Sequence, residues 1–362
     1  MEAPTKIYAA STAAAALVAG ILVAPSPASA DFSGQTIEII VPFAPGGATD
    51  VAARFLEKYL ERHLAGNPNV EVVNREGGGS ILGANWFEAN ARPDGQRVLF
   101  TTSSTANPYV LGQPEVEYDL AAYRVAYGLP FGSVTYVSSA TGIATVEDFA
   151  NAEGLIYGGI GAAASDLPTL LSFELFDVDV QSALGFTGRG PIRLSFERGE
   201  TNVDFQFTPV YLTQVADTVE AGNAVALMSG GYMAADGNMT DRDPAVPDLP
   251  SVYEAYVDLH GEAPSGVEWD AYNAMAALTL GFGLSAYLHA DTPEEIIQLY
   301  ADAVERINAD PEFLEESQQV VGGYPLSSPI EAEGPLRAAL QPSDEVREYL
   351  INLLSEKYDV DF

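Results

Sequence analysis

Residues 37–54 constrain the fold more than any other stretch of the chain. The segment begins with a β-branched run, residues 37–41, of the kind that forms a buried strand. Two prolines then end the strand, and the pair Gly46 and Gly47 allows a tight turn. A helix is predicted to begin near Thr49 or Asp50, with apolar residues recurring every four positions. A strand, a glycine turn and a helix start in this order aim unpaired backbone N–H groups at an anion.

The composition excludes several classes of function. The chain has 362 residues and 47% hydrophobic content, so it can bury a sizeable core, and two lobes are expected. Its 51 acidic and 16 basic residues give a formal charge of −35, which excludes a sequence-independent nucleic-acid binder. With no Cys and three His, there is no disulfide or Cys nucleophile and little material for a zinc site or a Ser-His-Asp triad. No cofactor and no metal are therefore expected.

Residues 1–30 are predicted to be a signal peptide. Lys6 precedes an Ala-rich apolar run, and Ala28-Ser29-Ala30 has the small-x-small form of a cleavage site. The run could just span a bilayer as an anchor, but its weakly apolar composition favours a signal cleaved between Ala30 and Asp31. The mature chain is expected to be a soluble exported protein.

Two further segments repeat the pattern of the first turn. A strand over 69–74 leads into glycines and a helix from about Ser80, so Gly78, Gly79 and Ser80 form a second candidate anion turn. A third strand over 98–100 runs into five hydroxyl residues at 101–105. Open α/β sheets bind ligands at the carboxyl edge of their strands, although a solvated loop would fit these hydroxyls equally well.

The rest of the chain alternates between strands and helices. Extended segments are predicted over 125–138, 203–207 and 278–287, and a third glycine turn, residues 158–166, opens a helix that runs to about 176. Another helix is expected to end near Arg198, and the last third is helical, with start signals at Thr292 and Asp310. This alternation predicts an α/β architecture.

Several motifs together resemble a known family. The likeness rests on two motifs: residues 41–50 (Val-Pro-Phe-Ala-Pro-Gly-Gly-Ala-Thr-Asp) and residues 74–84 (Asn-Arg-Glu-Gly-Gly-Gly-Ser-Ile-Leu-Gly-Ala). Three shorter segments follow in order: Asn107-Pro108, Phe186-Thr187-Gly188 and residues 248–255. This set resembles the substrate-binding proteins of tripartite tricarboxylate transporters, the Bug or TctC-like receptors. The likeness extends over most of the mature chain.

The resemblance implies an α/β, two-lobed periplasmic-binding-protein fold of type II, with a ligand cleft between the lobes. Lobe 1 is expected to comprise residues 31–138 plus 262–362, and lobe 2 residues 139–261. In such receptors the first two glycine turns hold a carboxylate through backbone N–H groups and ordered water. The expected ligand-binding residues are Phe43, Ala44, Gly46, Gly47, Thr49, Asp50, Gly78, Gly79, Ser80, Thr102, Ser103, Ser104, Ala164, Ser165, Asp166, Thr187, Arg189 and Asp204.

Three of these positions allow two interpretations each. Arg189 could supply the bidentate counter-charge for an anionic ligand, or it could lie on a solvated helix face together with Arg193. Asp166 is expected to cap its helix; in a cleft it would repel a carboxylate. Phe43 is either a core residue or a lid over the apolar part of the ligand.

The chain departs from the family pattern at three places. Ala163 and Ala164 replace the usual Gly-Ser, Thr187 and Arg189 stand where the family often has Lys and Gly, and residues 269–279 look inserted. Because these departures fall near the ligand, the identity of the ligand is not carried over.

The sequence therefore predicts a periplasmic, monomeric receptor that passes a small carboxylate to membrane transporter subunits. One alternative is the same fold acting as a sensor that presents its ligand to a membrane kinase. A second alternative is a secreted hydrolase with paired carboxylates, but no stretch isolates two acids in an apolar setting. No enzymatic activity and no nucleic-acid partner are expected.

Overall fold

The computed structural model describes residues 1, 2 and 31–362, so the predicted signal and its cleavage site lie outside the described residues, except for the first two positions and Asp31. The described chain folds around two five-stranded sheets. The strands of the first sheet, in the order β2-β1-β3-β10-β4, are β2 (Asn69–Asn74), β1 (Thr36–Val41), β3 (Arg97–Thr101), β10 (Leu284–Leu288) and β4 (Arg124–Leu129).

The second sheet has the order β7-β6-β8-β5-β9. Its strands are β7 (Val180–Leu184), β6 (Leu155–Gly159), β8 (Val203–Phe207), β5 (Ser133–Ser138) and β9 (Ala224–Ser229). In each sheet three parallel strands are followed by one antiparallel strand, β10 in the first and β5 in the second, which pairs with both of its neighbours. The two sheets thus share one plan, and the predicted two-lobed α/β fold is confirmed.

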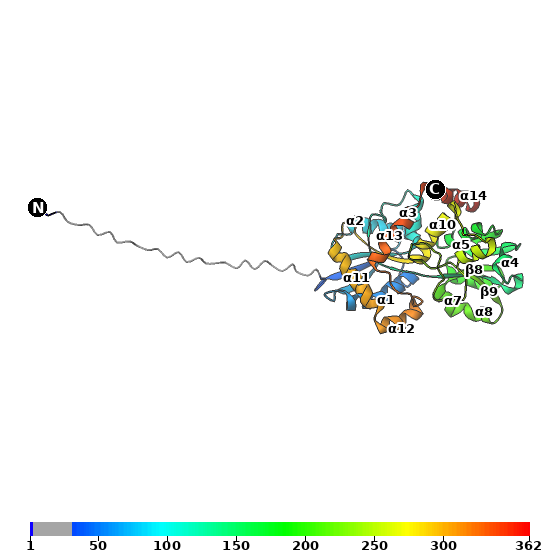
Figure 1. The fold of residues 1–362 in the computed structure, drawn as a ribbon, viewed down its shortest axis with the longest axis horizontal. Helices are drawn as coiled ribbons and strands as arrows, with labels where there is room; N and C mark the ends of the chain where they lie inside the picture. Colours follow the sequence, from blue (N-terminus) through cyan, green and yellow to red (C-terminus); the bar gives the residue numbers. More distant parts are fainter. Residues whose placement is uncertain (3–30) are drawn as a thin grey trace. The chain divides into compact units, whose positions relative to one another are not determined.

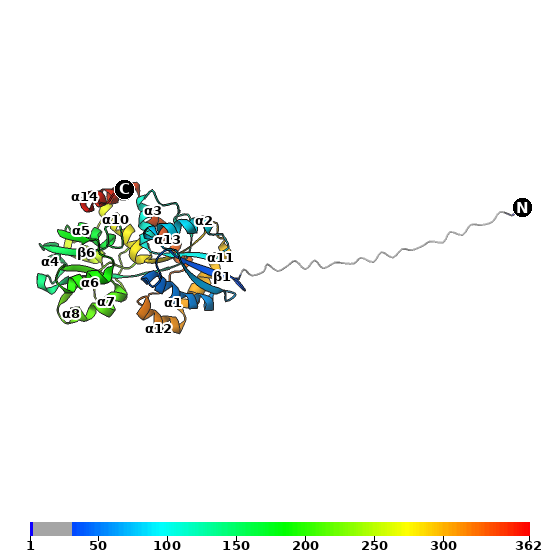
Figure 2. The same ribbon diagram turned by 180° about the vertical axis from the view of Figure 1, so that it is seen from behind.

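Helices pack around both sheets (Figures 1 and 2). The helices that accompany the first sheet are α1 (Ala48–His63), α2 (Ile81–Asn90), α3 (Ser103–Leu111), α11 (Glu294–Asn308), α12 (Pro311–Val320) and α13 (Pro329–Leu340). Those that accompany the second are α4 (Val146–Ala150), α5 (Leu167–Leu175), α6 (Arg189–Glu197), α7 (Thr208–Gln214), α8 (Ala216–Glu220) and α9 (Val252–His260). A further helix, α14 (Asp344–Tyr358), contacts α3, and its Lys357 pairs with Glu174 in the second set of helices. No helix in the described part of the chain is long and apolar enough to cross a membrane.

The extended segment predicted over 125–138 is two strands in different sheets. β4 ends at Leu129, and β5 begins at Ser133 in the second sheet, where it pairs with β8 and β9. Both strands are apolar and extended, so the sequence pattern does not separate them. The division into lobes remains a proposal, and strand membership moves its first boundary from residue 138 to the segment 130–132.

The returning strand predicted over 278–287 is shorter than expected. Ala277–Gly281 forms a π-helical turn, and only Leu284–Leu288 is the strand β10. Apolar residues dominate both pieces, and an apolar run alone does not distinguish a buried helical turn from a strand.

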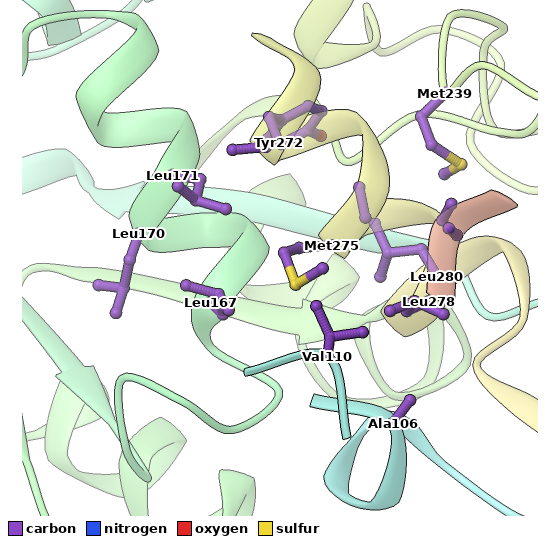
Figure 3. Close-up of a cluster of buried hydrophobic side chains, with 14 of the residues drawn as sticks. Ala106, Val110, Leu167, Leu170, Leu171, Met239, Tyr272, Met275, Leu278 and Leu280 are labelled. Carbon is purple, nitrogen blue, oxygen red and sulfur yellow. The ribbon is translucent and has the colours of Figure 1, made fainter. Parts of the chain in front are cut away.

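The segment that looked inserted forms α10 (Val267–Ala276), which packs between the two sets of helices. It contacts α5 of the second set, α13 of the first, and α14. Figure 3 shows Met275 of α10 lying between Leu167 of α5 and Val110 of α3, and all three are essentially buried. Met275 therefore joins the lobes through an apolar contact. Burying a side chain of this size contributes about 1.5–3 kcal/mol to the stability of the fold.

Candidate ligand-binding site

The first glycine turn is braced from inside by Asp50, whose residue surface is 3% exposed. The Gly46 amide donates to Asp50 Oδ2 at 2.8 Å. The Asn74 side-chain amide donates to Asp50 Oδ1 and to the Phe43 carbonyl, both at 3.0 Å. Gly46 itself has φ +80, a conformation that glycine adopts without strain. The turn is therefore fixed by the carboxylate of the protein itself.

The charge of Asp50 is balanced by Arg54, one helical turn further along α1. Their closest side-chain atoms are 3.0 Å apart, and the Arg54 side chain is 48% exposed. Burial raises the pKa of Asp50, but the hydrogen bonds from Arg54, the Gly46 amide and Asn74 outweigh it, so the pKa lies below its usual value. Asp50 thus stays ionised as the turn's internal anchor.

The helix that follows this turn begins without a side-chain cap. Gly47 is the N-cap residue of α1, and no side chain accepts from the amides of the first turn. Those amides have no acceptor within a helix, and the positive end of the helix dipole lies among them. Gly46 and Gly47 are exposed, as is Ala44, whereas Phe43 is half-buried and packs against the lobe 1 core. The turn can therefore receive an anion from solvent.

The second glycine turn has an unusual backbone. Gly77, Gly78, Gly79 and Ser80 all have positive φ. A Cβ on the nearby Gly83 would lie 2.3 Å from the Arg75 carbonyl, so the helix α2 approaches this turn too closely for any other residue. Both features require glycine, and they turn the chain sharply before α2.

The predicted hydroxyl run starts a helix and is not a loop. Thr102 caps α3 by accepting a hydrogen bond from the Ser104 amide at 3.2 Å. The Ser80 hydroxyl accepts from Thr105 Oγ1 at 2.8 Å and donates to the Ser104 carbonyl at 3.3 Å. Ser103 is buried. These contacts bring the second glycine turn and the start of α3 together at this edge of the sheet.

Asn107 connects the lobes. It lies on α3, and its Nδ2 donates to the carbonyls of Ala163 and Ala164 in the third glycine turn, at 3.1 and 3.2 Å. The residue is 0% exposed. The sequence offered only the Asn-Pro pair as a signal, and Asn107 was not among the predicted ligand-binding residues.

Asp166 does not cap its helix, contrary to the prediction. It precedes α5 but makes no capping hydrogen bond, because its carboxylate turns back to the preceding turn. Oδ2 accepts from the amides of Ile160 and Gly161 at 3.0 and 3.2 Å, and Oδ1 accepts from the Tyr157 hydroxyl at 2.5 Å. The third glycine turn is therefore also fixed by an internal carboxylate.

Arg189 lies between Asp166 and Asp204 and is not on a solvated face. Its Nη1 is 2.8 Å from Asp166 Oδ1, while its Nη2 donates to Asp204 and to the Phe205 carbonyl. The guanidinium stacks 3.7 Å above the Phe205 ring, and the side chain is 12% exposed. Both ends of the fork are thus engaged by the protein, whereas Arg193 pairs with Glu197 one turn away, as expected.

Asp204 completes this buried network. Its Oδ2 accepts from the Tyr136 hydroxyl at 2.5 Å and from the Gln206 amide at 3.1 Å. Burial raises the pKa of Asp204 to about 6, although Arg189, Tyr136 and Gln206 all oppose the rise. One guanidinium therefore serves two carboxylates. The sequence prediction missed both tyrosines and Gln206. Tyr136 lies 68 residues before Asp204 and leaves no local signal, whereas Gln206 follows Asp204 by two residues on the same strand.

The remaining predicted residues of lobe 2 lie around this network. Ala164 offers its carbonyl to Asn107, Ser165 is half-buried beside Asp166, and Thr187 is exposed just before α6. Within the described residues, no group of three His, Cys, Asp or Glu side chains could hold a metal ion.

Comparisons with known proteins agree with this architecture. No protein-family model matches the chain. Protein BugT of Bordetella pertussis is 29% identical to it over 256 residues, which cover 66% of this chain and 72% of BugT.

Solved structures show the same fold. A TctC solute-binding protein from Polaromonas superposes with a TM-score of 0.64 at 20% identity, covering 88% of this chain and 98% of that one. R. palustris Rpa4515 with adipate gives 0.59 at 18% identity, covering 89% and 97%. MatC from Rhodopseudomonas palustris with bound malate gives 0.54 at 20% identity, covering 87% and 98%. The resemblance is confirmed: the chain is similar in sequence to BugT and in fold to these solute-binding proteins of the Bug/TctC-like kind.

Proposed function

We propose that this protein is an extracytoplasmic receptor for a small organic carboxylate: a di- or tricarboxylate or an aromatic acid. It would deliver this ligand to a tripartite tricarboxylate-type transporter in the membrane. The observation that carries the proposal is the uncapped start of α1 behind an exposed glycine turn, which Asp50 and Asn74 hold in shape. A helix N-terminus of this kind is suited to a carboxylate. The malate and adipate in two structural neighbours support the same ligand class.

The proposed site extends from lobe 1 to lobe 2. One wall is formed by Gly46, Gly47 and Thr49 of the first turn, Gly78 to Ser80 of the second, and Thr102 to Ser104 at the start of α3. The opposite wall comprises Ala164 to Asp166, Thr187, Arg189 and Asp204. Of these, Arg189, Asp166 and Asp204 act as positioning residues, because they hold the third glycine turn in place. A ligand that bridges both walls stabilises the closed state over the open one.

The protein is proposed to act without catalysis, as a periplasmic monomer released from its signal peptide. Asp166 and Asp204 are close enough to one guanidinium to suggest the paired acids of a hydrolase. However, each carboxylate accepts hydrogen bonds from at least two further groups of the protein, which favours a structural role. The general acid of a hydrolase would have to face its substrate.

A thermal-shift screen of residues 31–362 against mono-, di- and tricarboxylates, from low to high salt, tests the proposal. A ligand at a hundred times its dissociation constant adds about 2.7 kcal/mol of stability. We expect a shift for one class of carboxylate. A folded protein that responds to no acid would contradict the proposal, and so would one that converts its ligand into a product.

A further inference from the structure

A buried hydrogen-bond acceptor with no donor in the described part of the chain lies where the lobes meet, on Asn107. Asn107 Nδ2 donates to the carbonyls of Ala163 and Ala164. Since only the amide nitrogen can donate to two carbonyls, these contacts fix the orientation of the amide, and Oδ1 is the remaining acceptor. Oδ1 is buried and has no hydrogen-bond partner within the described residues. Such an acceptor costs free energy until a donor reaches it.

The third glycine turn directs its donors away from this surface. The amides of Ile160 and Gly161 donate to Asp166, and the Ala164 amide donates to the Gly161 carbonyl at 3.0 Å. The carbonyls of Ala163 and Ala164 accept instead from Asn107 of α3, and the Ala164 carbonyl also accepts from the Leu167 amide at 3.2 Å. The first turn of lobe 1 presents amides, whereas this turn presents carbonyls.

The charge behind this turn has the same sign as a carboxylate. Asp166 and Asp204 are each 0% exposed, and Arg189 is the guanidinium that lies between them. With both carboxylates ionised, the formal charge of the three groups is −1. A second carboxylate of a ligand at this wall would meet an uncompensated negative charge in a poorly solvated place, which is unfavourable. An ammonium group would be attracted.

From these observations we infer that the wall formed by lobe 2 selects a carboxylate ligand whose far end carries a hydrogen-bond donor. An ammonium group is preferred to a hydroxyl at that end, and a second carboxylate is disfavoured. This inference rests on the proposed function, in which lobe 1 binds the first carboxylate. Within the small organic carboxylates, it favours amino and hydroxy acids with a single carboxylate over the di- and tricarboxylates considered above. The Ala163 carbonyl, which has one lone pair left, and Asn107 Oδ1 would accept from the donor.

Titration calorimetry with ligands of matched length tests this selectivity. The probes are butyrate, 4-hydroxybutyrate, 4-aminobutyrate and succinate, and then pentanoate, 5-hydroxypentanoate, 5-aminopentanoate and glutarate. In the series that fits the site, the amino acid should bind at least about tenfold more tightly than the dicarboxylate, with the hydroxy acid between them. Tighter binding of succinate or glutarate would overturn the inference and leave the receptor function intact. If a folded protein binds no acid at all, the proposed function itself fails.

Two variants test whether the buried negative charge causes the selectivity or whether any change of charge alters it. Asp204→Asn removes one buried charge on the far side of Arg189 and should reduce the preference for amino acid over dicarboxylate several-fold. Glu220→Gln makes the same change of charge on the exposed face of α8 and should leave that preference unchanged. Equal effects of the two variants would contradict a role for the buried network.

Asn107→Leu replaces the orphan acceptor with an apolar group of similar volume. It should weaken binding of the hydroxy and amino acids more than binding of butyrate or pentanoate. A uniform loss for all ligands would indicate damage to the lobe contact and would count against the assigned acceptor.

Discussion

Asp50 in lobe 1 and Asp166 in lobe 2 fix their glycine turns in the same way. Each carboxylate accepts from a backbone amide of its turn and pairs with an arginine, Arg54 or Arg189. The arginines differ, because the Arg54 side chain is 48% exposed whereas that of Arg189 is 12% exposed. In lobe 1, Asp50 leaves the following helix start open. In lobe 2, the carboxylate takes two amides of the turn, and a second buried acid lies behind it.

This difference shows that a carboxylate paired with an arginine can fix two glycine turns that present different hydrogen-bonding groups. The turn of lobe 1 leaves the amides at the start of α1 without a side-chain acceptor among the described residues, whereas the turn of lobe 2 directs carbonyls toward Asn107 of lobe 1. A receptor with these two walls would bind the two ends of its ligand by different chemistry. Four substitutions probe the comparison.

Arg189→Met should have the largest effect. It leaves Asp166 and Asp204 buried without a cation, and breaking a buried ion pair in this way costs about 3–5 kcal/mol. Urea unfolding of the mature chain measures the loss. Asp166→Asn combined with Asp204→Asn in the Arg189→Met background should recover part of the stability; no recovery would show that packing, and not charge, causes the loss.

Asp204→Asn should change how stability depends on pH. The raised pKa of Asp204, about 6, means that the folded protein binds this proton more tightly than the unfolded chain. The stability from this group is thus fully present below the unfolded-state pKa and is lost as the pH rises through about 6. Between pH ~4 and pH ~7 the wild type should lose of order 2 kcal/mol relative to Asp204→Asn. Unfolding curves at several pH values would refute this if the two proteins change in parallel.

Asn74→Ala should have a moderate effect in lobe 1. It removes the donor to Asp50 Oδ1 and to the Phe43 carbonyl. Loss of a hydrogen bond to a partly buried charged group costs about 1–2 kcal/mol. The measurement is denaturant unfolding. Asn69→Ala, at the exposed start of β2, is the matched control and should cost less. Equal losses would mean that Asn74 does not brace the turn.

Arg54→Met should have the smallest effect, although its ion pair resembles that of Arg189. The Arg54 side chain is about half exposed, so water and salt screen the pair, and its loss should cost less than about 1 kcal/mol. High salt should reduce the difference further. A cost similar to that of Arg189→Met would remove the distinction between the two lobes.

The sequence predicted those parts of the fold and site that depend on neighbouring residues. β1, the first turn and α1 were predicted correctly because strand, glycine and helix signals follow one another within 20 residues or so. The helix start at Asp310 was likewise predicted, and the Asp310 side chain caps α12. Thr292 also looked like a cap, but Pro293 takes that position and no side chain caps α11.

Contacts between distant residues could not be predicted. β5 belongs to the second sheet only because it pairs with β8 and β9, about 70 to 90 residues later in the chain. In the same way, Tyr136 of β5 reaches Asp204 of β8, 68 residues later in the chain. Asp166 has the local pattern of a helix cap, yet the donors of the preceding turn and Arg189 draw its carboxylate away.

Titration calorimetry on Gly47→Val tests the central claim, that the first glycine turn holds the ligand carboxylate. Gly47 has φ −75, and an added Cβ would make only an ordinary 3.5 Å contact with the Ala44 carbonyl, so valine fits the backbone but would cover the amides of α1. Gly334→Val, on the exposed face of α13 with open space around it, is the control. We predict that the acid found in the thermal-shift screen binds the wild type and Gly334→Val alike and binds Gly47→Val at least about tenfold more weakly. Equal binding by all three folded proteins would contradict the account.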